Sequence, residues 1–295
     1  MTHVSVGPIR AHNVRLDASA SVSGLPPLTG IMGCADVLRR QFHGDDAETD
    51  ATSNIDVLIV LHDVQVYPGR FKPSPNHSAE PTEVPETMEG MVEFTLIIRG
   101  LEVSGPRAAR SLVGRRFCGG NVVLLPAALK DRDNADLAKI LSSLPPGRVL
   151  LDRRDLLERD LPGDPLDKIL HYLTWVPVAV DKNEDVSQKN GDGENSEKSK
   201  KPDKEAGFRR PEPGWLVPIA VGYQALESYD EGRFRKGTRD QSTPHLFVED
   251  LIGLGELVST RTLARKLRAG AEQNGIFWKW CVDLDRGEFL ITALS

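Results

Sequence analysis

Six consecutive residues combine two positive charges, an aromatic ring and two glycines, a pattern that can bind RNA. They are Arg115, Arg116, Phe117, Cys118, Gly119 and Gly120. Glycine lets backbone amides approach a phosphate, arginine donates charge-assisted hydrogen bonds, and a phenylalanine ring can stack on an unpaired base. The alternative is a tight turn that buries Phe117 in the core. Taken alone, the six residues favour the turn.

A second candidate contact surface is the long segment between two predicted strands, residues 67–90. It begins Tyr-Pro-Gly-Arg-Phe-Lys-Pro and then becomes acidic. A connection of this length without periodicity is usually functional or disordered. Arg70, Phe71 and Lys72 are the candidates for RNA contact, and a base stacked on Phe71 would contribute roughly 1 to 3 kcal/mol. The acidic part would repel phosphate, so we expect it to face solvent or a basic partner.

The histidines and cysteines give no support for catalysis or metal binding. No histidine lies in a recognisable pattern with a serine, a cysteine or a second acid; the histidines are His3, His12, His43, His62, His77, His171 and His245. General acid–base catalysis needs a positioned group with a pKa near the working pH, which a sequence does not exclude. His62 lies in an apolar strand and is most simply structural. The three cysteines, Cys34, Cys118 and Cys281, are too far apart for a zinc pattern or a disulfide framework, and we expect reduced, mostly buried thiols.

The overall charge limits how the chain can contact nucleic acid. Its formal net charge is −6, which argues against coating nucleic acid through bulk charge. Any RNA contact is therefore expected to be local. No apolar run approaches the roughly 20 residues that span a bilayer, and the first ten residues lack the pattern of a secretory signal. We expect a cytoplasmic protein without membrane association.

The first 125 residues predict the strands and helices that would position these segments. Residues 4–16, 55–66, 91–101 and 121–125 have the β-branched or alternating apolar residues of strands. Residues 28–42 and 106–113 have helical character. The order is β-α-β-β-α-β, which is typical of a ferredoxin-like or RRM-like domain of the α+β class. In that arrangement both helices cover one face of the sheet and leave the other face available.

The remaining residues divide into three parts. Residues 126–180 predict an appended helical subdomain, with helices at 134–144 and 165–175 around a short strand at 148–151. Residues 181–206 contain one valine and no aromatic residue. They cannot bury enough apolar surface to order, so we expect a disordered charged linker. Residues 207–295 regain apolar character and are expected to pack back on the first domain, with a last strand at 289–293.

Several large side chains in this last part are expected to lie inside the protein. Trp215 and Tyr223 favour the core over ligand contact. Phe247, Leu251 and Leu254 follow one another at helical spacing, which predicts a buried or interface face.

The stretch from Pro213 to Glu256 carries a resemblance to a known family. It reads Pro-Gly-Trp-Leu-Val-Pro-Ile-Ala-Val-Gly-Tyr-Gln-Ala-Leu and, further on, Thr-Arg-Asp-Gln-Ser-Thr-Pro-His-Leu-Phe-Val-Glu-Asp-Leu-Ile-Gly-Leu-Gly-Glu. These residues are similar to the type I-F (Csy) CRISPR subunit of the RAMP superfamily that holds the 5′ end of the guide RNA. Weaker similarity includes Gly24-Leu25-Pro26-Pro27 before the first helix, although Ser23 stands where the family is expected to have an aromatic residue.

The resemblance implies an RRM-like RAMP domain with a β-hairpin thumb, no cofactor and no catalysis. Residues 67–90 would be the thumb, and Arg115 to Gly120 would be the glycine-rich loop of RAMP proteins. The implied partners are the 5′ handle of the crRNA, the large Csy subunit, a filament of backbone Csy subunits and, through the complex, target double-stranded DNA. Arg235 and Arg239 lie inside the matched stretch and would bind the handle backbone or a neighbouring subunit.

Two rival functions remain open from the sequence. The first is a guide-processing endoribonuclease of the same superfamily, because related RAMP proteins cut RNA with a histidine as general acid or base. The second is a structural adaptor that binds the large subunit and touches RNA little.

Overall fold

The computed structural model describes residues 2–19, 21–43, 55–67, 88–159, 163–174, 176–180, 205–227 and 245–294, with the backbone alone in 176–180 and 205–209. Five candidate site residues lie outside this part of the chain, as do residues 181–204 of the expected linker; the five are Arg70, Phe71, Lys72, Arg235 and Arg239. The chain forms two compact units, residues 1–160 with 214–295 and residues 161–213.

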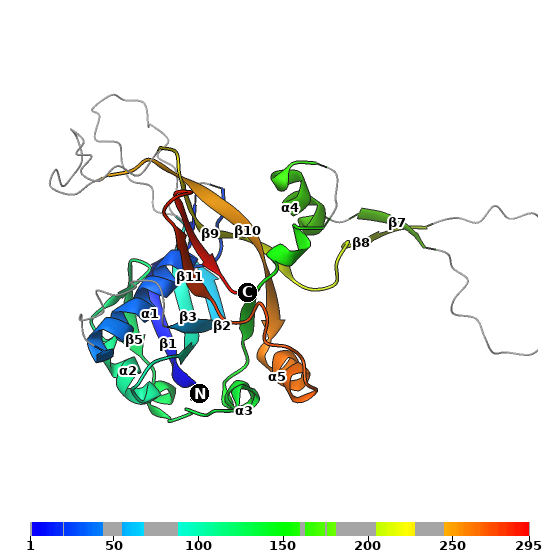
Figure 1. Cartoon of the computed structure of the whole chain (residues 1–295). Helices are drawn as coiled ribbons and strands as arrows, with labels where there is room; N and C mark the ends of the chain where they lie inside the picture. The colour runs from blue at the N-terminus through cyan, green and yellow to red at the C-terminus, as the bar shows by residue number, and fades with distance from the viewer. Residues whose placement is uncertain are drawn as a thin grey trace, which may run out of the picture. The chain divides into compact units, whose positions relative to one another are not determined.

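The first part of the chain follows the predicted order of elements. They are β1 (Val4–Arg15), α1 (Leu28–His43), β2 (Asp56–Val66), β3 (Glu89–Arg99), α2 (Gly105–Ser111), β4 (Arg116–Phe117) and β5 (Gly120–Leu124) (Figure 1). The strands pair antiparallel in the order β2-β3-β1-β5-β4. The predicted strands and helices of this region are therefore confirmed, and the two-residue β4 is an addition.

Later strands extend this sheet in the first unit. They are β6 (Arg148–Asp152), β9 (Leu216–Ala225), β10 (Val248–Ser259), β11 (Lys279–Asp283) and β12 (Glu288–Thr292). The described strands of the sheet run in the order β11-β12-β9-β10-β6-β2-β3-β1-β5-β4. The helices α3 (Leu137–Ser143) and α5 (Thr260–Arg268) complete the unit, with 3-10 turns at Pro126–Leu129 and Arg154–Leu156. The α+β class is thus confirmed, and the strand predicted at 289–293 is β12.

One expectation for the residues after 207 is wrong, and one spacing has another cause. Residues 248–259 form the strand β10, so the helical spacing of Phe247, Leu251 and Leu254 does not come from a helix; β10 pairs with β9 on one side and with β6 on the other. Trp215 is 50% exposed, and the guanidinium of Arg148 lies 4.3 Å from its ring centroid. Together with His62 and Leu257, the two side chains line a cavity of about 530 Å³. Tyr223 is partly buried.

The second unit has a helix and a hairpin in its described part. The helix α4 (Pro165–Leu173) follows Asp164, whose carboxylate accepts a hydrogen bond from the Asp167 amide at 2.9 Å, while the Asp167 carboxylate accepts one from the Asp164 amide. This capping box satisfies amides that the first turn leaves unpaired. The strand β7 (Val176–Val180) pairs antiparallel with β8 (Glu205–Arg209). Within residues 126–180, α3 and β6 thus belong to the first unit, and α4 and β7 to the second.

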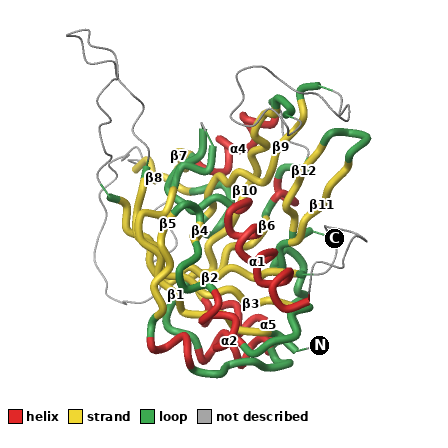
Figure 2. The backbone as a smooth tube through the Cα atoms, turned by 90° about the vertical axis from the view of Figure 1, so that its left-hand side faces the viewer, coloured by secondary structure: helices red, strands yellow, loops and turns green. Residues whose placement is uncertain are grey.

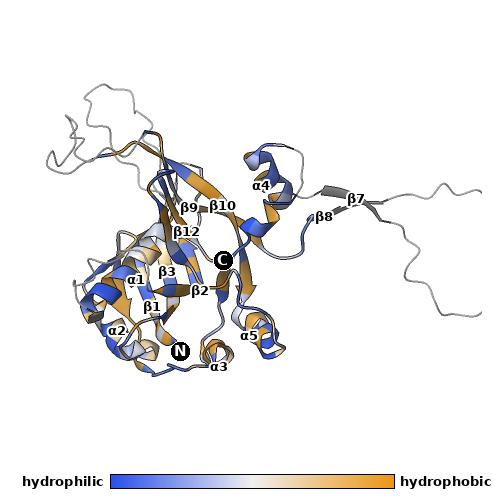
Figure 3. Cartoon of the chain, in the orientation of Figure 1, coloured by the Kyte–Doolittle hydropathy of each residue, from blue (hydrophilic) through white to orange (hydrophobic). Residues whose placement is uncertain are grey.

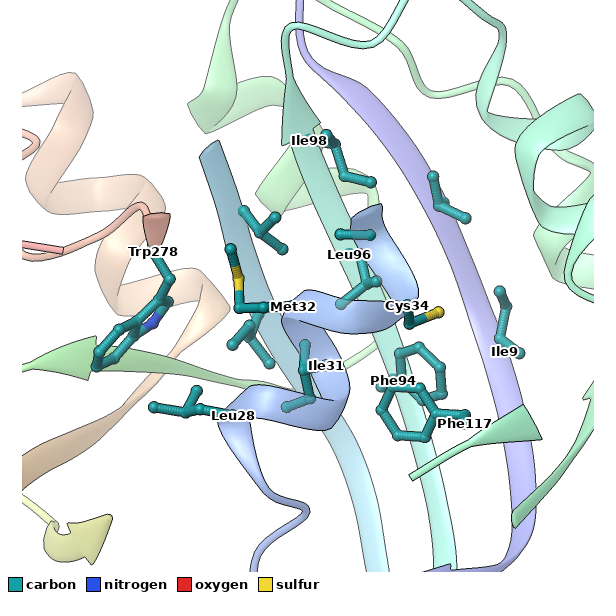
Figure 4. Close-up of a cluster of buried hydrophobic side chains, with 14 of the residues drawn as sticks. Ile9, Leu28, Ile31, Met32, Cys34, Phe94, Leu96, Ile98, Phe117 and Trp278 are labelled. Carbon is teal, nitrogen blue, oxygen red and sulfur yellow. The ribbon is translucent and has the colours of Figure 1, made fainter. Parts of the chain in front are cut away.

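One face of the sheet is apolar and is covered by α1 and α2. The apolar residues of α1 that repeat at helical spacing, among them Ile31 and Met32, belong to the same buried cluster as Phe94 and Leu96 of β3 (Figure 4). Figure 2 shows α1 lying across this face. Fully burying side chains of this size stabilises the fold by about 1.5 to 3 kcal/mol each, so this face forms the main core.

The opposite face is half covered, whereas the sequence predicted that it would be available. Leu58, Val60 and Ile97 point to this face and form a second core cluster with apolar residues of α3 and α5. The two helices present apolar stripes, for example Ile140 and Leu263, that need a partner surface. The covered half is the end of the sheet near Leu58 and Ile97. We call the other half, which α3 and α5 leave uncovered, the open half.

We expect Phe117→Ala to lower the free energy of unfolding by about 3 to 5 kcal/mol, because the ring is 1% exposed and a cavity would replace it. Denaturant titration measures this change. Val123→Ala, on the neighbouring strand at 44% exposure, is the control and should change stability by less than about 0.5 kcal/mol. Equal losses in the two variants would contradict the assignment of Phe117 to the core.

Candidate nucleic-acid interface

The glycine-rich segment is a tight hairpin turn between β4 and β5, which we call the glycine turn. Arg116 pairs with Asn121, and Phe117 pairs with Gly120. The two residues between them, Cys118 and Gly119, have φ angles of 45° and 82°. Two consecutive residues with positive φ match the twist of a two-residue hairpin, which explains the glycine at the second position.

Phe117 is not available to a base. Its ring stacks on Phe94, with centroids 4.0 Å apart and an interplanar angle of 16°, inside the main core. The turn interpretation was therefore right for this residue, and the proposed stacking role is wrong. The physical reason is the two-residue alternation of β4, which turns Phe117 toward α1 and Arg116 to the opposite face.

The two arginines of the motif have different surroundings. Arg115 donates hydrogen bonds to the carbonyl of Ser111 and to Oε1 of Gln41, both at 3.1 Å, so its guanidinium is held over α1 and α2. Arg116 is exposed, and its side chain has no hydrogen-bond or ion-pair partner among the described residues. A phosphate can thus reach Arg116 more freely than Arg115.

Strand register places Arg116 in a row of polar side chains. Arg116 lies opposite Asn121 of β5, and Asn121 lies opposite His12 of β1. Directly opposed residues of neighbouring strands share a face. The imidazole Nδ1 of His12 lies 3.4 Å from the hydroxyl of Tyr67. We call Arg116, Asn121, His12 and Tyr67 the polar row.

The next residues along the strands form a second row on the same face. Val123 lies opposite Arg10, and Arg10 lies opposite Glu93. The Arg10 guanidinium donates to the Glu93 carboxylate at 3.0 Å, which neutralises both charges. Of the two arginines in these rows, Arg116 at the edge of the sheet is therefore the one without an acidic partner among the described residues.

The ends of the long β2–β3 connection lie beside the same turn. The amide of Arg15 donates to the carbonyl of Cys118 at 2.9 Å, and the amide of Leu16 donates to the carbonyl of Met88 at 2.8 Å. At its other end, the amide of Tyr67 donates to the carbonyl of Glu89 at 2.8 Å. The C-terminal end of β1 thus joins the glycine turn to the base of the connection that contains Arg70, Phe71 and Lys72.

The close approach at Gly120 explains one glycine of the motif. A Cβ atom at this position would lie 2.6 Å from the carbonyl oxygen of His12 and 2.8 Å from a methyl of Val14. Any larger residue would push β5 away from β1. Gly120 therefore maintains the strand spacing that aligns the polar row.

The chemistry of the open half suits binding. An arginine can hold a phosphate, an asparagine amide can both donate to and accept from a base edge, and a tyrosine ring can stack on a base. His12, Asn121 and Tyr67 are candidates that the sequence did not single out. His12 and Asn121 occupy polar positions in the predicted strands 4–16 and 121–125, and Tyr67 directly follows the predicted strand 55–66, which is the signal that could have found them.

His62 has the structural role that the sequence predicted. Its Nδ1 lies 3.1 Å from the carbonyl of Pro146, and its Nε2 lies 2.8 Å from the hydroxyl of Thr95. A carbonyl only accepts, so Nδ1 carries the proton and Nε2 accepts from Thr95. Burial lowers the pKa of His62 and also that of His3. Both nitrogens of His62 are thus engaged by the fold.

Other chemistry has little support within the described residues. No group of three or more histidine, cysteine or acidic side chains there is placed to hold a metal ion. No helix of that part is long and apolar enough to cross a membrane. Burial raises the pKa of the Cys34 thiol to about 12 and raises that of Cys118 as well. Cys281 is exposed, unlike the other two.

Two comparisons with known proteins match the chain. The family model described as CRISPR-associated protein (Cas_Csy2) matches residues 102–291, which is more than half of the chain. The chain is also 35% identical over 153 residues to the CRISPR-associated protein Csy2 of Pseudomonas aeruginosa strain UCBPP-PA14. That match covers 50% of this chain and 45% of the relative, so the chain matches about half the length of the relative.

We expect His62→Gln to flatten the pH dependence of stability on the acid side of neutrality. The folded-state pKa of His62 lies below 6.5, so the unfolded state binds the proton first. The wild-type free energy of unfolding then falls as the pH falls below about 6.5, toward the folded-state pKa. Denaturant titrations at several pH values measure the slope.

The exposed His171 supplies the control for this slope. His171→Gln should retain the wild-type decline in stability with falling pH. If His62→Gln also retained it in full, the neutral buried form of His62 would not be the source.

Proposed function

Because the chain belongs to the Cas_Csy2 family of CRISPR-associated proteins, we propose that it is the non-catalytic subunit of a type I-F (Csy) surveillance complex that binds the 5′ handle of the crRNA. One observation carries the proposal. The glycine turn, the polar row and both ends of the β2–β3 connection meet at the C-terminal end of β1. A basic edge, hydrogen-bonding side chains and a long connection at one place fit a single-stranded RNA end.

The fold supports an RRM-like domain of the RAMP type. The strands β2-β3-β1-β5 and the helices α1 and α2 have the order and the one-sided helix layer of a β-α-β-β-α-β domain. We propose that residues 67–90 act as the thumb, since Tyr67 and Glu89 at its two ends are hydrogen-bonded to each other at the proposed binding edge. Arg70, Phe71 and Lys72 remain candidates there, and Arg235 and Arg239 remain candidates beyond the described residues.

We propose a separate role in RNA binding for each of these side chains. Arg116 neutralises a phosphate, and its distance from acidic partners keeps that charge available. Asn121 and His12 hydrogen-bond a base edge, which supplies sequence preference, and Tyr67 offers a ring for stacking. Arg115 positions the turn through Gln41 and Ser111. None of these roles requires a cofactor or breaks a bond.

The partners follow from the proposed complex. The crRNA handle would be held between this chain and the large Csy subunit, beside a filament of backbone Csy subunits. Target double-stranded DNA would be recognised by pairing with the guide, because RNA-guided effectors delegate sequence reading to base pairing.

We predict that Arg116→Glu reduces the RNA retained by the co-expressed complex. Loss of one phosphate contact should lower the slope of log affinity against log salt by about 0.7, the value for a single strand. Filter binding of handle RNA at several salt concentrations measures the slope. Arg110→Glu, an exposed arginine of α2 outside the polar row, carries the same charge change and should leave the slope unchanged.

The rival endoribonuclease rests on one specific contact, between His12 and Tyr67 in the polar row. An imidazole beside a hydroxyl could act in acid–base chemistry. We expect no cleavage when the purified protein is incubated with precursor guide RNA in the absence of metal, as followed on a denaturing gel. Cleavage that disappears in His12→Ala would establish the rival function.

A further inference from the structure

The helix α5 is strongly basic in an acidic protein. Its nine residues, Thr260–Arg268, contain four cations and no acid. The chain as a whole has a net charge of −6. Ser259 caps the start of the helix: its hydroxyl accepts a hydrogen bond from the Thr262 amide at 3.1 Å, so the first helical residue, Thr260, is well defined.

Packing fixes which face of α5 is presented to solvent. Leu263 and Ala264 are buried in the second core cluster against α3, and Leu267 packs beside them. The four cations are exposed: Arg261, Arg265, Lys266 and Arg268. Figure 3 shows hydrophilic and hydrophobic residues on the same helix. The basic face is thus held on a rigid support and needs no ordering before it binds.

These cations differ from seven other described arginines in lacking acidic partners. Ion pairs neutralise Arg10, Arg15, Arg39, Arg40, Arg153, Arg154 and Arg286. Within the described residues, no carboxylate pairs with a cation of α5, and Arg268 donates instead to the hydroxyl of Ser142 at 2.6 Å. Lys139 of the neighbouring α3 pairs loosely with Asp136, at 3.9 Å. Positive charge left uncompensated on one face is available to an anionic partner.

The spacing of the arginines suits a phosphate backbone. Arg261, Arg265 and Arg268 follow at i, i+4 and i+7, so they form one stripe. At about 1.5 Å per residue the stripe spans roughly 10 Å. Phosphates of one duplex strand repeat every 3.4 Å or so along the axis, so about three of them fit along the stripe. Arginine also binds phosphate in a bidentate fork, which lysine cannot do.

We propose that the exposed face of α5 binds the sugar–phosphate backbone of a nucleic acid, at a site separate from the polar row. The second site is sequence-independent, because it offers guanidinium groups and no base-reading amide or aromatic ring. The inference rests on the proposed function in a nucleic-acid complex and adds a direct backbone contact by this chain. Its ligand is a duplex or a single strand, which share the same phosphate chemistry.

The test compares salt dependence in the assembled, guide-containing complex. Arg261→Gln with Arg265→Gln removes two charges and keeps good helix formers. Binding of a duplex without complementarity to the guide, and of an unrelated single-stranded RNA, is measured by fluorescence anisotropy across salt concentrations. We expect the slope of log affinity against log salt to fall by about 1.8 for the duplex or by about 1.4 for the single strand. The strand whose slope falls identifies the ligand.

Two further variants separate charge at α5 from charge in general. Lys130→Gln with Lys279→Gln removes the same charge from exposed positions elsewhere and should leave both slopes unchanged. Arg261→Lys with Arg265→Lys retains charge and should keep most of the slope. Thermal unfolding of each variant should match the wild type, because the substituted side chains are exposed.

The results that would refute the α5 site differ from the result that would refute the handle site. Unchanged slopes for both strands in the glutamine variant would refute it, and the handle site would stand if Arg116→Glu still reduced guide retention. Loss of a partner subunit from the purified complex, with unchanged slopes, would make α5 a protein interface and refute it as well. A wild-type complex that retains no guide RNA would refute the handle proposal instead.

Discussion

The two-residue alternation of β1 is the constraint on which both the core and the proposed binding face depend. β1 lies between β3 and β5, so each of its side chains points either into the α1 layer or to the opposite face. Ile9, Ala11 and Val14 contribute to the main core. Arg10 and His12 alternate with them and point to the open half. A shift of one residue would exchange the two sets, so packing of the core fixes the position of the polar row.

An irregularity near the end of β1 shows how the strand keeps its apolar side chains in the core. Strict alternation would place His12 and Val14 on the same face, but the register shifts between these two residues. Asn13 absorbs the shift with a φ of 55°, a region that asparagine tolerates better than most residues. Val14 thereby returns to the core, and the amide of Arg15 meets the carbonyl of Cys118. The bulge therefore joins the strand to the glycine turn.

Local patterns were enough to predict the strands and helices of residues 1–125, because β-branched runs and an amphipathic helix have distinct periods. They were not enough for β10, whose apolar residues fit two periods, or for the cover of the second face by α3 and α5, which depends on partners distant in sequence. The same limit applies to the site. Arg116 was predicted from its motif, but the burial of Phe117 depends on contact with Phe94, and the polar row exists only through the pairing of β4, β5 and β1.

Contacts with α1 and the core hold the glycine turn in a fixed position, as the proposed binding edge requires. A Cβ atom on Gly30 of α1 would lie 2.6 Å from Sγ of Cys118, so helix and turn approach each other closely. The Cys118 thiol also lies 3.8 Å from the carbonyl of Pro27, just before α1. Burial keeps this thiol protonated by raising its pKa, which leaves it as a small packing group. With Phe117 stacked in the core on one side of the turn and Gly120 fitted against β1 on the other, Arg116 projects from backbone that is already ordered. The proposed binding would then cost less conformational entropy than binding at a free loop, so the core that buries Phe117 would also prepare the proposed phosphate contact.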